Sequence, residues 1–109
     1  MLENVEKLLE EKKYKEAQAE LINLNCSDVA EFLEDVDTTE IIKILKLMTK
    51  DKVADVFAYL SVEKETEVIS LLSDKEAVSL LDDMYTDDAV DLLGEMPANV
   101  VRRLLKKLL

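Results

Sequence analysis

The sequence contains no histidine, no tryptophan and only one cysteine, and it has no glycine-rich phosphate loop. These absences exclude the usual nucleophile–base pairs and the common Cys/His zinc sites. Paired carboxylates could still catalyse a reaction, but that chemistry needs a cleft, and short packed helices fill their interior with apolar side chains. We therefore expect no catalytic residues and no organic cofactor, so that the protein is not an enzyme.

Glycine and proline occur only once each, while 49% of the residues are hydrophobic and 36% are charged. The scarcity of turn residues argues against an all-β chain, and the apolar content argues against a disordered tail. The composition therefore favours helices. Because Cys26 is the only cysteine, no intramolecular disulfide can form, and a cytoplasmic setting is the default expectation.

No run of about 18 apolar residues occurs in the sequence, so we expect no direct membrane insertion of this segment. The first residues, MLENVEKLLEEKKYKEAQ, are amphipathic and lack the uninterrupted apolar stretch of a signal peptide. The 14 basic and 25 acidic residues give a formal net charge of −11. This charge disfavours nucleic acid and anionic membranes as partners, and it suits divalent cations or basic surfaces.

A twelve-residue repeat begins at Ser27. Written in lines of twelve, such as TEIIKILKLMTK and DKVADVFAYLSV, the sequence keeps positions 3, 6, 7 and 10 apolar. This spacing of i, i+3, i+4 and i+7 is the apolar stripe of one short helix, and it resets in each line. The seventh position ends at Leu105 and the tenth at Leu108, while the third position has one exception, Glu65.

Candidate N-caps stand where the repeat resets, and each is followed within three residues by an acid. These candidates are Ser27, Thr38, Thr49, Ser61, Ser73 and Thr86. Upstream, apolar spacing predicts two further helices within residues 1–26. Helices of about ten residues are marginal alone, so each must bury its stripe on its neighbours.

These features predict an all-α protein, a right-handed α-α superhelix of about nine short helices with a twelve-residue repeat. We expect a single domain over residues 1–109, with an N-terminal helical pair in residues 1–26 and the helical repeats in residues 27–109. Such stacks offer extended surfaces to partners and seldom form an enzyme pocket.

An acidic segment lies between Asp74 and Glu95, with eight acids and one base, Lys75. Asp87 and Asp91 are one helical turn apart and point the same way, although like charges at this spacing destabilise a helix by a few tenths of a kcal/mol. The helix dipole favours acids that follow a cap, which would explain Asp87 without any ligand. Alternatively, the two carboxylates supply part of a site for a hard divalent cation such as Mg²⁺, which takes only one or two protein oxygens.

Two segments, VADVFAYLSVEKETEVISLLS and MYTDDAVDLLGEMPANVVRRLLKKL, resemble the cytosolic N-terminal domain of the MgtE magnesium transporters. The resemblance covers nearly the whole chain. It implies a regulatory, Mg²⁺-sensing domain on the cytoplasmic side of an inner or plasma membrane protein. Its implied partners are the CBS domains of the same chain or of the dimer mate in a homodimeric transporter. At high Mg²⁺, ions that bridge acids of the two kinds of domain would favour pore closure.

Carried over from this resemblance, the metal-bridging acids fall on Asp87, Asp91 and Asp55, and the adjacent Asp88 could serve as a spare ligand. Two oxygens displace little of the water shell of Mg²⁺, so we expect the isolated domain to bind Mg²⁺ weakly. A second hypothesis is a FliG-like or armadillo-like helical scaffold that binds protein, because FliG has a similar style of repeat. Sequence beyond Leu109 would separate the two, since CBS domains and apolar spans there would support a transporter.

Overall fold

The computed structural model of the chain describes the backbone of residues 2–108 and the side chains of residues 3–107. Within this range there are nine α-helices and no strand, so the predicted all-α fold is confirmed. The helices are α1 (Leu2–Glu10), α2 (Tyr14–Ile22), α3 (Cys26–Leu33), α4 (Thr38–Leu45), α5 (Lys50–Ala58), α6 (Val62–Leu71), α7 (Asp74–Asp83), α8 (Thr86–Glu95) and α9 (Ala98–Leu108). None of these helices has both the length and the apolar character that crossing a bilayer requires.

The first residues of α3 to α9 follow one another at intervals of twelve, at positions 26, 38, 50, 62, 74, 86 and 98. Three of the predicted caps are confirmed, because the hydroxyls of Thr49, Ser61 and Ser73 each accept a hydrogen bond from a backbone N–H three residues later. Ser73 also completes a capping box, since the Glu76 carboxylate accepts from the Ser73 N–H at 3.0 Å.

Three predicted caps were wrong, because they lie within the first turn of their helices: Ser27, Thr38 and Thr86. The N-cap positions are held instead by Asn25, Asp37 and Tyr85, of which only Asn25 makes a side-chain capping hydrogen bond. All three stand in the same twelve-residue register as the confirmed caps. Asn25 and Asp37 are themselves preferred N-cap residues, so only α8 begins after a residue, Tyr85, that is not one.

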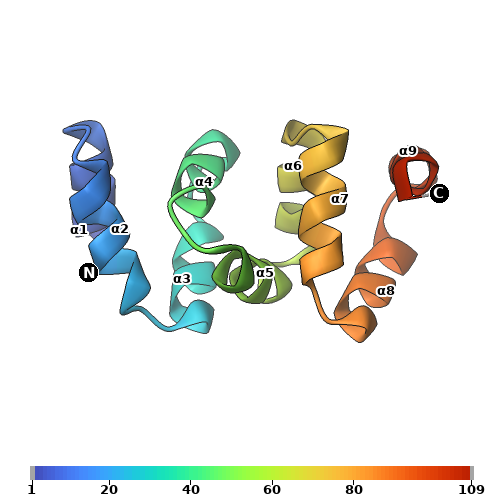
Figure 1. Cartoon of the computed structure of the whole chain (residues 1–109), viewed down its shortest axis with the longest axis horizontal. Coiled ribbons are helices and arrows are strands. Elements are labelled where there is room, and N and C mark those ends of the chain that lie inside the picture. The colour runs from blue at the N-terminus through green and yellow to red at the C-terminus, as the bar shows by residue number, and fades with distance from the viewer. Residues whose placement is uncertain (1, 109) are drawn as a thin grey trace.

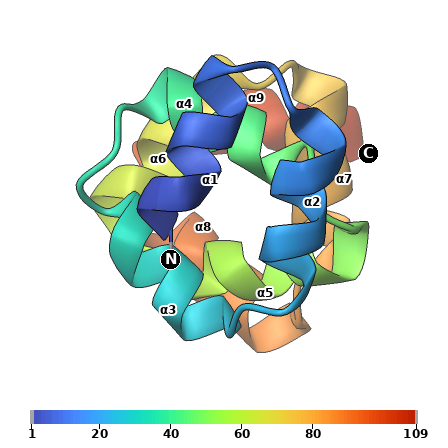
Figure 2. The ribbon, with the colours of Figure 1, turned by 90° about the vertical axis from the view of Figure 1, so that its left-hand side faces the viewer.

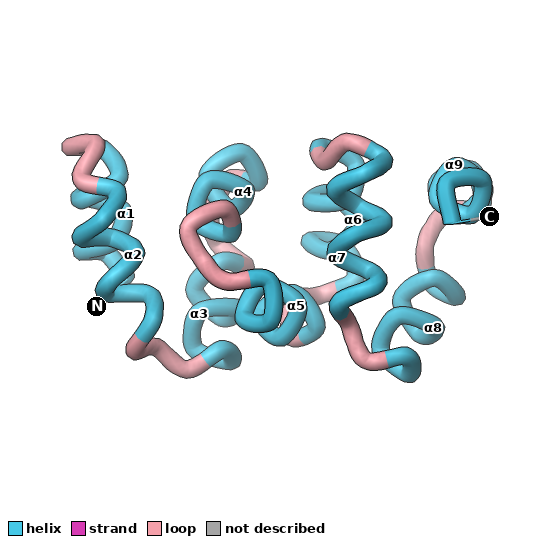
Figure 3. The backbone as a smooth tube through the Cα atoms, viewed as in Figure 1, coloured by secondary structure: helices cyan, strands magenta, loops and turns pink. Residues whose placement is uncertain are grey.

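The helices stack along the long axis of the molecule, whose dimensions are 39 × 22 × 22 Å, and the chain ends lie at opposite ends of the stack (Figures 1 and 3). α1 packs against α2. Further along, the main contacts skip one helix, so that α3 packs on α5, α5 on α7, α7 on α9, and α4 on α6. In the view along the stack the helices surround its long axis (Figure 2), as expected for an α-α superhelix. Its right-handed sense stays a prediction.

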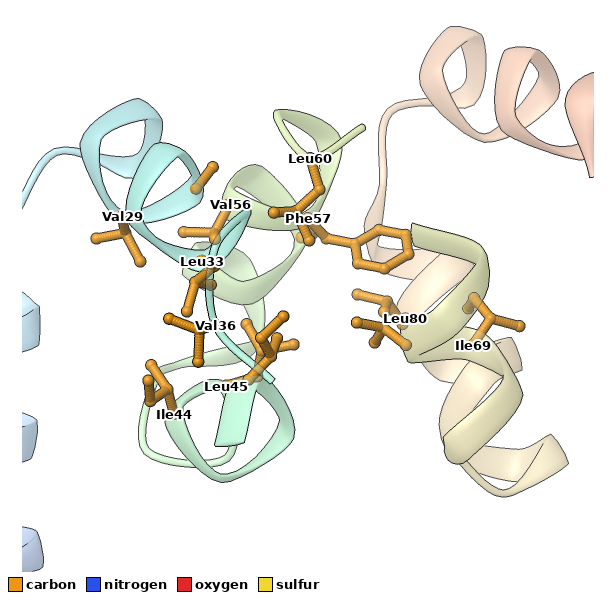
Figure 4. Close-up of a cluster of buried hydrophobic side chains, with 14 of the residues drawn as sticks. Val29, Leu33, Val36, Ile44, Leu45, Val56, Phe57, Leu60, Ile69 and Leu80 are labelled. Carbon is orange, nitrogen blue, oxygen red and sulfur yellow. The ribbon is translucent and has the colours of Figure 1, made fainter. Parts of the chain in front are cut away.

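The core runs through the stack as one cluster of buried apolar side chains. Phe57 of α5 is fully buried and points toward Leu80 of α7 (Figure 4), which joins the middle of the stack to the helices that follow. One predicted stripe residue departs from the pattern: Leu105 of α9 is exposed, whereas Leu104 beside it is fully buried as predicted. The side chain of Leu108, the last residue in the tenth position of the repeat, lies outside the described part of the chain.

Candidate functional site

Helix α8 presents three acids on one side. Asp88, Asp91 and Glu95 have the spacing i, i+3 and i+7, which places them on the same helix face. All three side chains are exposed, and none forms a hydrogen bond or an ion pair with another residue in the described part of the chain. The helix therefore carries several negative charges that no neighbouring side chain neutralises.

These three acids line a small hollow together with Glu65 of α6. The cavity has a volume of about 160 Å³, and we refer to it as the Glu65 hollow. Its remaining lining is apolar and comes from Ala58, Val62, Met84 and Leu92. Four carboxyl groups thus face a space that has apolar walls and no basic residue in its lining.

Glu65 is the acid that interrupts the third position of the repeat, where the other lines have apolar residues. Only 6% of its surface is exposed, and among residues 2–108 its carboxylate has no hydrogen-bond or ion-pair partner. Burial, and then the negative charges of Glu95, Asp88 and Glu34, raise the pKa of the Glu65 carboxyl to about 7. The adjacent Lys64 does not compensate this charge, because its Nζ donates to the Val36 carbonyl and pairs with Glu67.

A second, wider hollow lies beside the first and shares Asp88 with it. It has a volume of about 670 Å³, and we refer to it as the tyrosine hollow because Tyr59 and Tyr85 line it. Asp55 of α5 also lines it, so helices α5 and α8 each contribute one acid. The two tyrosines are strongly exposed, which leaves both hydroxyls available to an approaching partner surface.

The predicted metal ligands are only partly brought together by the fold. Asp55 and Asp88 line the tyrosine hollow, and Asp88 and Asp91 line the Glu65 hollow. Asp87 is exposed and lines neither of these two hollows. In the range 2–108 no three acids form a group that could hold a metal ion. The side chains concerned all carry carboxylate oxygens, the kind of ligand that suits a hard cation.

The basic residues of α9 do not neutralise the α8 acids in this structure. The Nε of Arg103 lies 2.8 Å from the Asp74 carboxylate, so this ion pair joins α9 to the first turn of α7. The Arg103 guanidinium also reaches the Ile69 carbonyl at 3.5 Å. Arg103, a base of the helix that follows the acidic α8, therefore binds α9 to α7, and the acids of α8 keep no ion-pair partner in the described residues.

Sequence reasoning did not identify Glu65 or Glu95 as site residues. Glu65 gave a signal, because it alone breaks an otherwise apolar position of the repeat. Glu95 belongs to the same helix face as Asp88 and Asp91, so helical periodicity would have added it. No local pattern in the sequence indicates that Tyr59 and Tyr85 share one hollow.

Comparison with known proteins identifies a family for most of the chain. Residues 24–109 match a family model described as the MgtE intracellular N domain. A search of curated proteins found no match. The matched range contains α3 to α9, and with them every acid of the Glu65 hollow and the tyrosine hollow.

Proposed function

Because the chain belongs to the family of the MgtE intracellular N domain, the N-terminal domain of MgtE-type magnesium transporters, we propose that it is a regulatory domain that senses Mg²⁺. Its acids act with acids of adjacent CBS domains, from the same chain or from the dimer mate. Bound ions between the two surfaces hold an arrangement that favours closure of the pore. The domain works on the intracellular side of a homodimeric transporter, as a binding module and not as an enzyme.

The observation that carries this proposal is that acids from α5 and α8 line two neighbouring hollows. Asp88 lines both hollows, with Asp55 in one and Asp91 in the other. Asp87 stands four residues before Asp91 on the same helix and adds its charge nearby. In the proposed arrangement, acids of the opposing domain supply further ligands to the ions that these carboxylates attract.

The same acids explain why the arrangement opens when Mg²⁺ falls. The chain carries a formal net charge of −11, and the α8 acids have no ion-pair partner in the described residues. A second acidic surface placed against them is repelled unless cations lie between the two. Closure is therefore coupled to Mg²⁺ by the ions that both surfaces share, and the free domain binds Mg²⁺ weakly.

The test is a pair of substitutions at the predicted ligands that share one helix. In the 109-residue chain, Mg²⁺ should raise the melting temperature more than NaCl at matched ionic strength, because binding to the native state alone stabilises it. Asp87→Asn/Asp91→Asn should reduce this excess, measured by differential scanning calorimetry. In the full-length transporter, the same double variant should keep the pore conducting at high intracellular Mg²⁺, measured as ion flux into liposomes.

A matched control removes the same charge from another helix. Asp82→Asn/Asp83→Asn takes two neighbouring acids from the last turn of α7, and neither has an ion-pair partner in the described part of the chain. The control variant should keep the Mg²⁺ excess and normal closure. If Asp87→Asn/Asp91→Asn closes with the wild-type Mg²⁺ dependence, these two acids serve only the helix terminus and the proposed role of Asp87 and Asp91 fails.

A further inference from the structure

We infer that the Glu65 hollow is a docking site for an arginine side chain of a partner protein. The guanidinium would lie among the carboxylates of Glu65, Asp91 and Glu95, and the alkyl stem would lie against the apolar walls. This inference goes beyond the proposed function and does not depend on it, because it concerns a different ligand and needs no Mg²⁺.

The first support is the position of Glu65. Its side chain is 6% exposed and lines the hollow, and within residues 2–108 it has no hydrogen-bond or ion-pair partner. The residue is therefore largely buried while its carboxylate borders the hollow, and a carboxylate beside apolar walls is better stabilised when a cation or hydrogen-bond donors contact it. The other charged residues that line the hollow are all acids, so none of them neutralises the Glu65 carboxylate. A cation supplied from outside would satisfy Glu65 and the α8 acids together.

The second support concerns the kind of cation. Four carboxyl groups from two helices line the hollow, and the described residues contain no group of three acids that could hold a metal ion. A guanidinium is broad and planar and presents five N–H donors, so it can contact several carboxylates at once. It is also less strongly hydrated than a lysine ammonium and therefore enters a partly apolar site more readily.

The third support is the shape and lining of the hollow. A volume of about 160 Å³ suits one side-chain end and not a folded element of a partner. Val62, Met84 and Leu92 offer apolar surface on which the methylene groups of an arginine can pack while its charged end reaches the acids. Because no base lines the hollow, no residue of the chain itself competes for the acids there.

The experiment titrates the 109-residue chain with N-acetyl-arginine amide and follows the methyl resonances of Val62, Met84 and Leu92 by NMR. N-acetyl-citrulline amide, which has the same shape without the charge, is the matched ligand control. The arginine derivative should shift these methyls saturably and should lower the pKa of Glu65, read from its side-chain carboxyl carbon. The citrulline derivative should do neither.

Two variants test the assignment of the site. Glu65→Gln keeps the shape of the side chain and should weaken arginine binding by about tenfold or more, since a charge-assisted pair becomes a neutral one. Asp82→Asn removes an exposed acid from α7, outside the hollow, and should change the affinity by less than about twofold. Circular dichroism verifies that both variants fold.

Two results would overturn the inference, and a third would identify the partner. Equal shifts with the citrulline derivative would show binding to the apolar walls alone. If MgCl₂ shifted the same methyl resonances and prevented binding of the arginine derivative, and NaCl at the same ionic strength did not, the hollow would be a metal site. Concentration-dependent shifts without ligand that Arg102→Gln abolishes would support the inference and identify a second copy of the chain as the partner. The Mg²⁺ test with Asp87→Asn/Asp91→Asn is decided separately, because it measures the response to Mg²⁺, whereas the arginine test uses Glu65→Gln without Mg²⁺; Asp91 lines the Glu65 hollow and Asp87 does not.

Discussion

Glu65 shows how one residue can oppose the pattern that places it. The repeat puts position 65 on the buried stripe of α6, and the side chain found there is an acid with 6% of its surface exposed. Its neighbours Glu95, Asp88 and Glu34 are all acids, so burial and repulsion act in the same direction on its pKa. At the residue scale, the native state therefore favours the protonated form of this carboxyl.

This raised pKa makes stability depend on pH. The native pKa of Glu65 is about 7 and its ordinary value is 4.5, so between these values the native state binds more protons than the unfolded state. The free energy of unfolding should therefore fall as pH rises from about 4.5 to about 7, by an amount on the order of 3 kcal/mol. Urea titrations at pH 5, 6, 7 and 8 should show Glu65→Gln gaining stability over the wild type along this series.

The control for this prediction is Asp82→Asn, an exposed acid of α7. Its stability difference from the wild type should vary little over the same pH range. A difference between Glu65→Gln and the wild type that is constant from pH 5 to pH 8 would contradict the raised pKa.

At the scale of one helix, α7 has the most complete start. Ser73 accepts from the Glu76 N–H at 3.1 Å, and Glu76 accepts in return from the Ser73 N–H at 3.0 Å. The α8 start lacks this support, because Tyr85 makes no side-chain capping bond. The stability of α8 therefore depends more on packing than that of α7 does. The exposed acids lie on this less well capped helix.

Removing the capping box gives a direct test. Ser73→Ala should lower the free energy of unfolding by about 1 kcal/mol, since it leaves the Glu76 N–H without its acceptor. Ser70→Ala is the matched control, because the Ser70 hydroxyl donates only to the Thr66 carbonyl inside α6. Both are measured by urea unfolding followed by circular dichroism. An equal loss in the two variants would show that the cap contributes nothing beyond the loss of a hydroxyl.

At the scale of the whole molecule, charge is the dominant unbalanced property. A formal net charge of −11 is spread over a body of 39 × 22 × 22 Å. The screening length is roughly 30 Å at 0.01 M salt and roughly 3 Å at 1 M. At low salt, acids therefore repel one another across the width of the stack, while at high salt only close neighbours interact.

The melting temperature should therefore rise with NaCl, by about 4–8 °C for each kcal/mol of repulsion that is screened. Calorimetry between 0.01 and 1 M NaCl measures this rise. Asp82→Lys/Asp83→Lys changes the net charge from −11 to −7, a difference of four units, and should show a smaller rise. A melting temperature that falls with salt would mean that ion pairs such as Arg103–Asp74 outweigh the repulsion.

The sequence by itself determined the helices and the family, because both depend on local patterns. Apolar spacing repeats within each short segment, so it predicts the helices from α3 to α9 without knowledge of their contacts. The resemblance to the MgtE N domain rests on segments within the matched range of residues 24–109. Helical periodicity likewise relates Asp91 to its neighbours on α8, since this relation is internal to one helix.

Only the tertiary structure decided which residues from different helices meet. Contacts between helices follow the packing of the stack, so Glu65 of α6 joins the α8 acids, and Asp55 of α5 shares a hollow with Asp88. The pairing of Arg103 with Asp74 likewise spans two helices. The pKa of Glu65 depends on burial and on charges distant in sequence, which no local pattern contains. Asp88 lines both hollows and Asp87 lines neither. This difference follows from the rotation of α8 about its own axis, which buries Leu92 in the core.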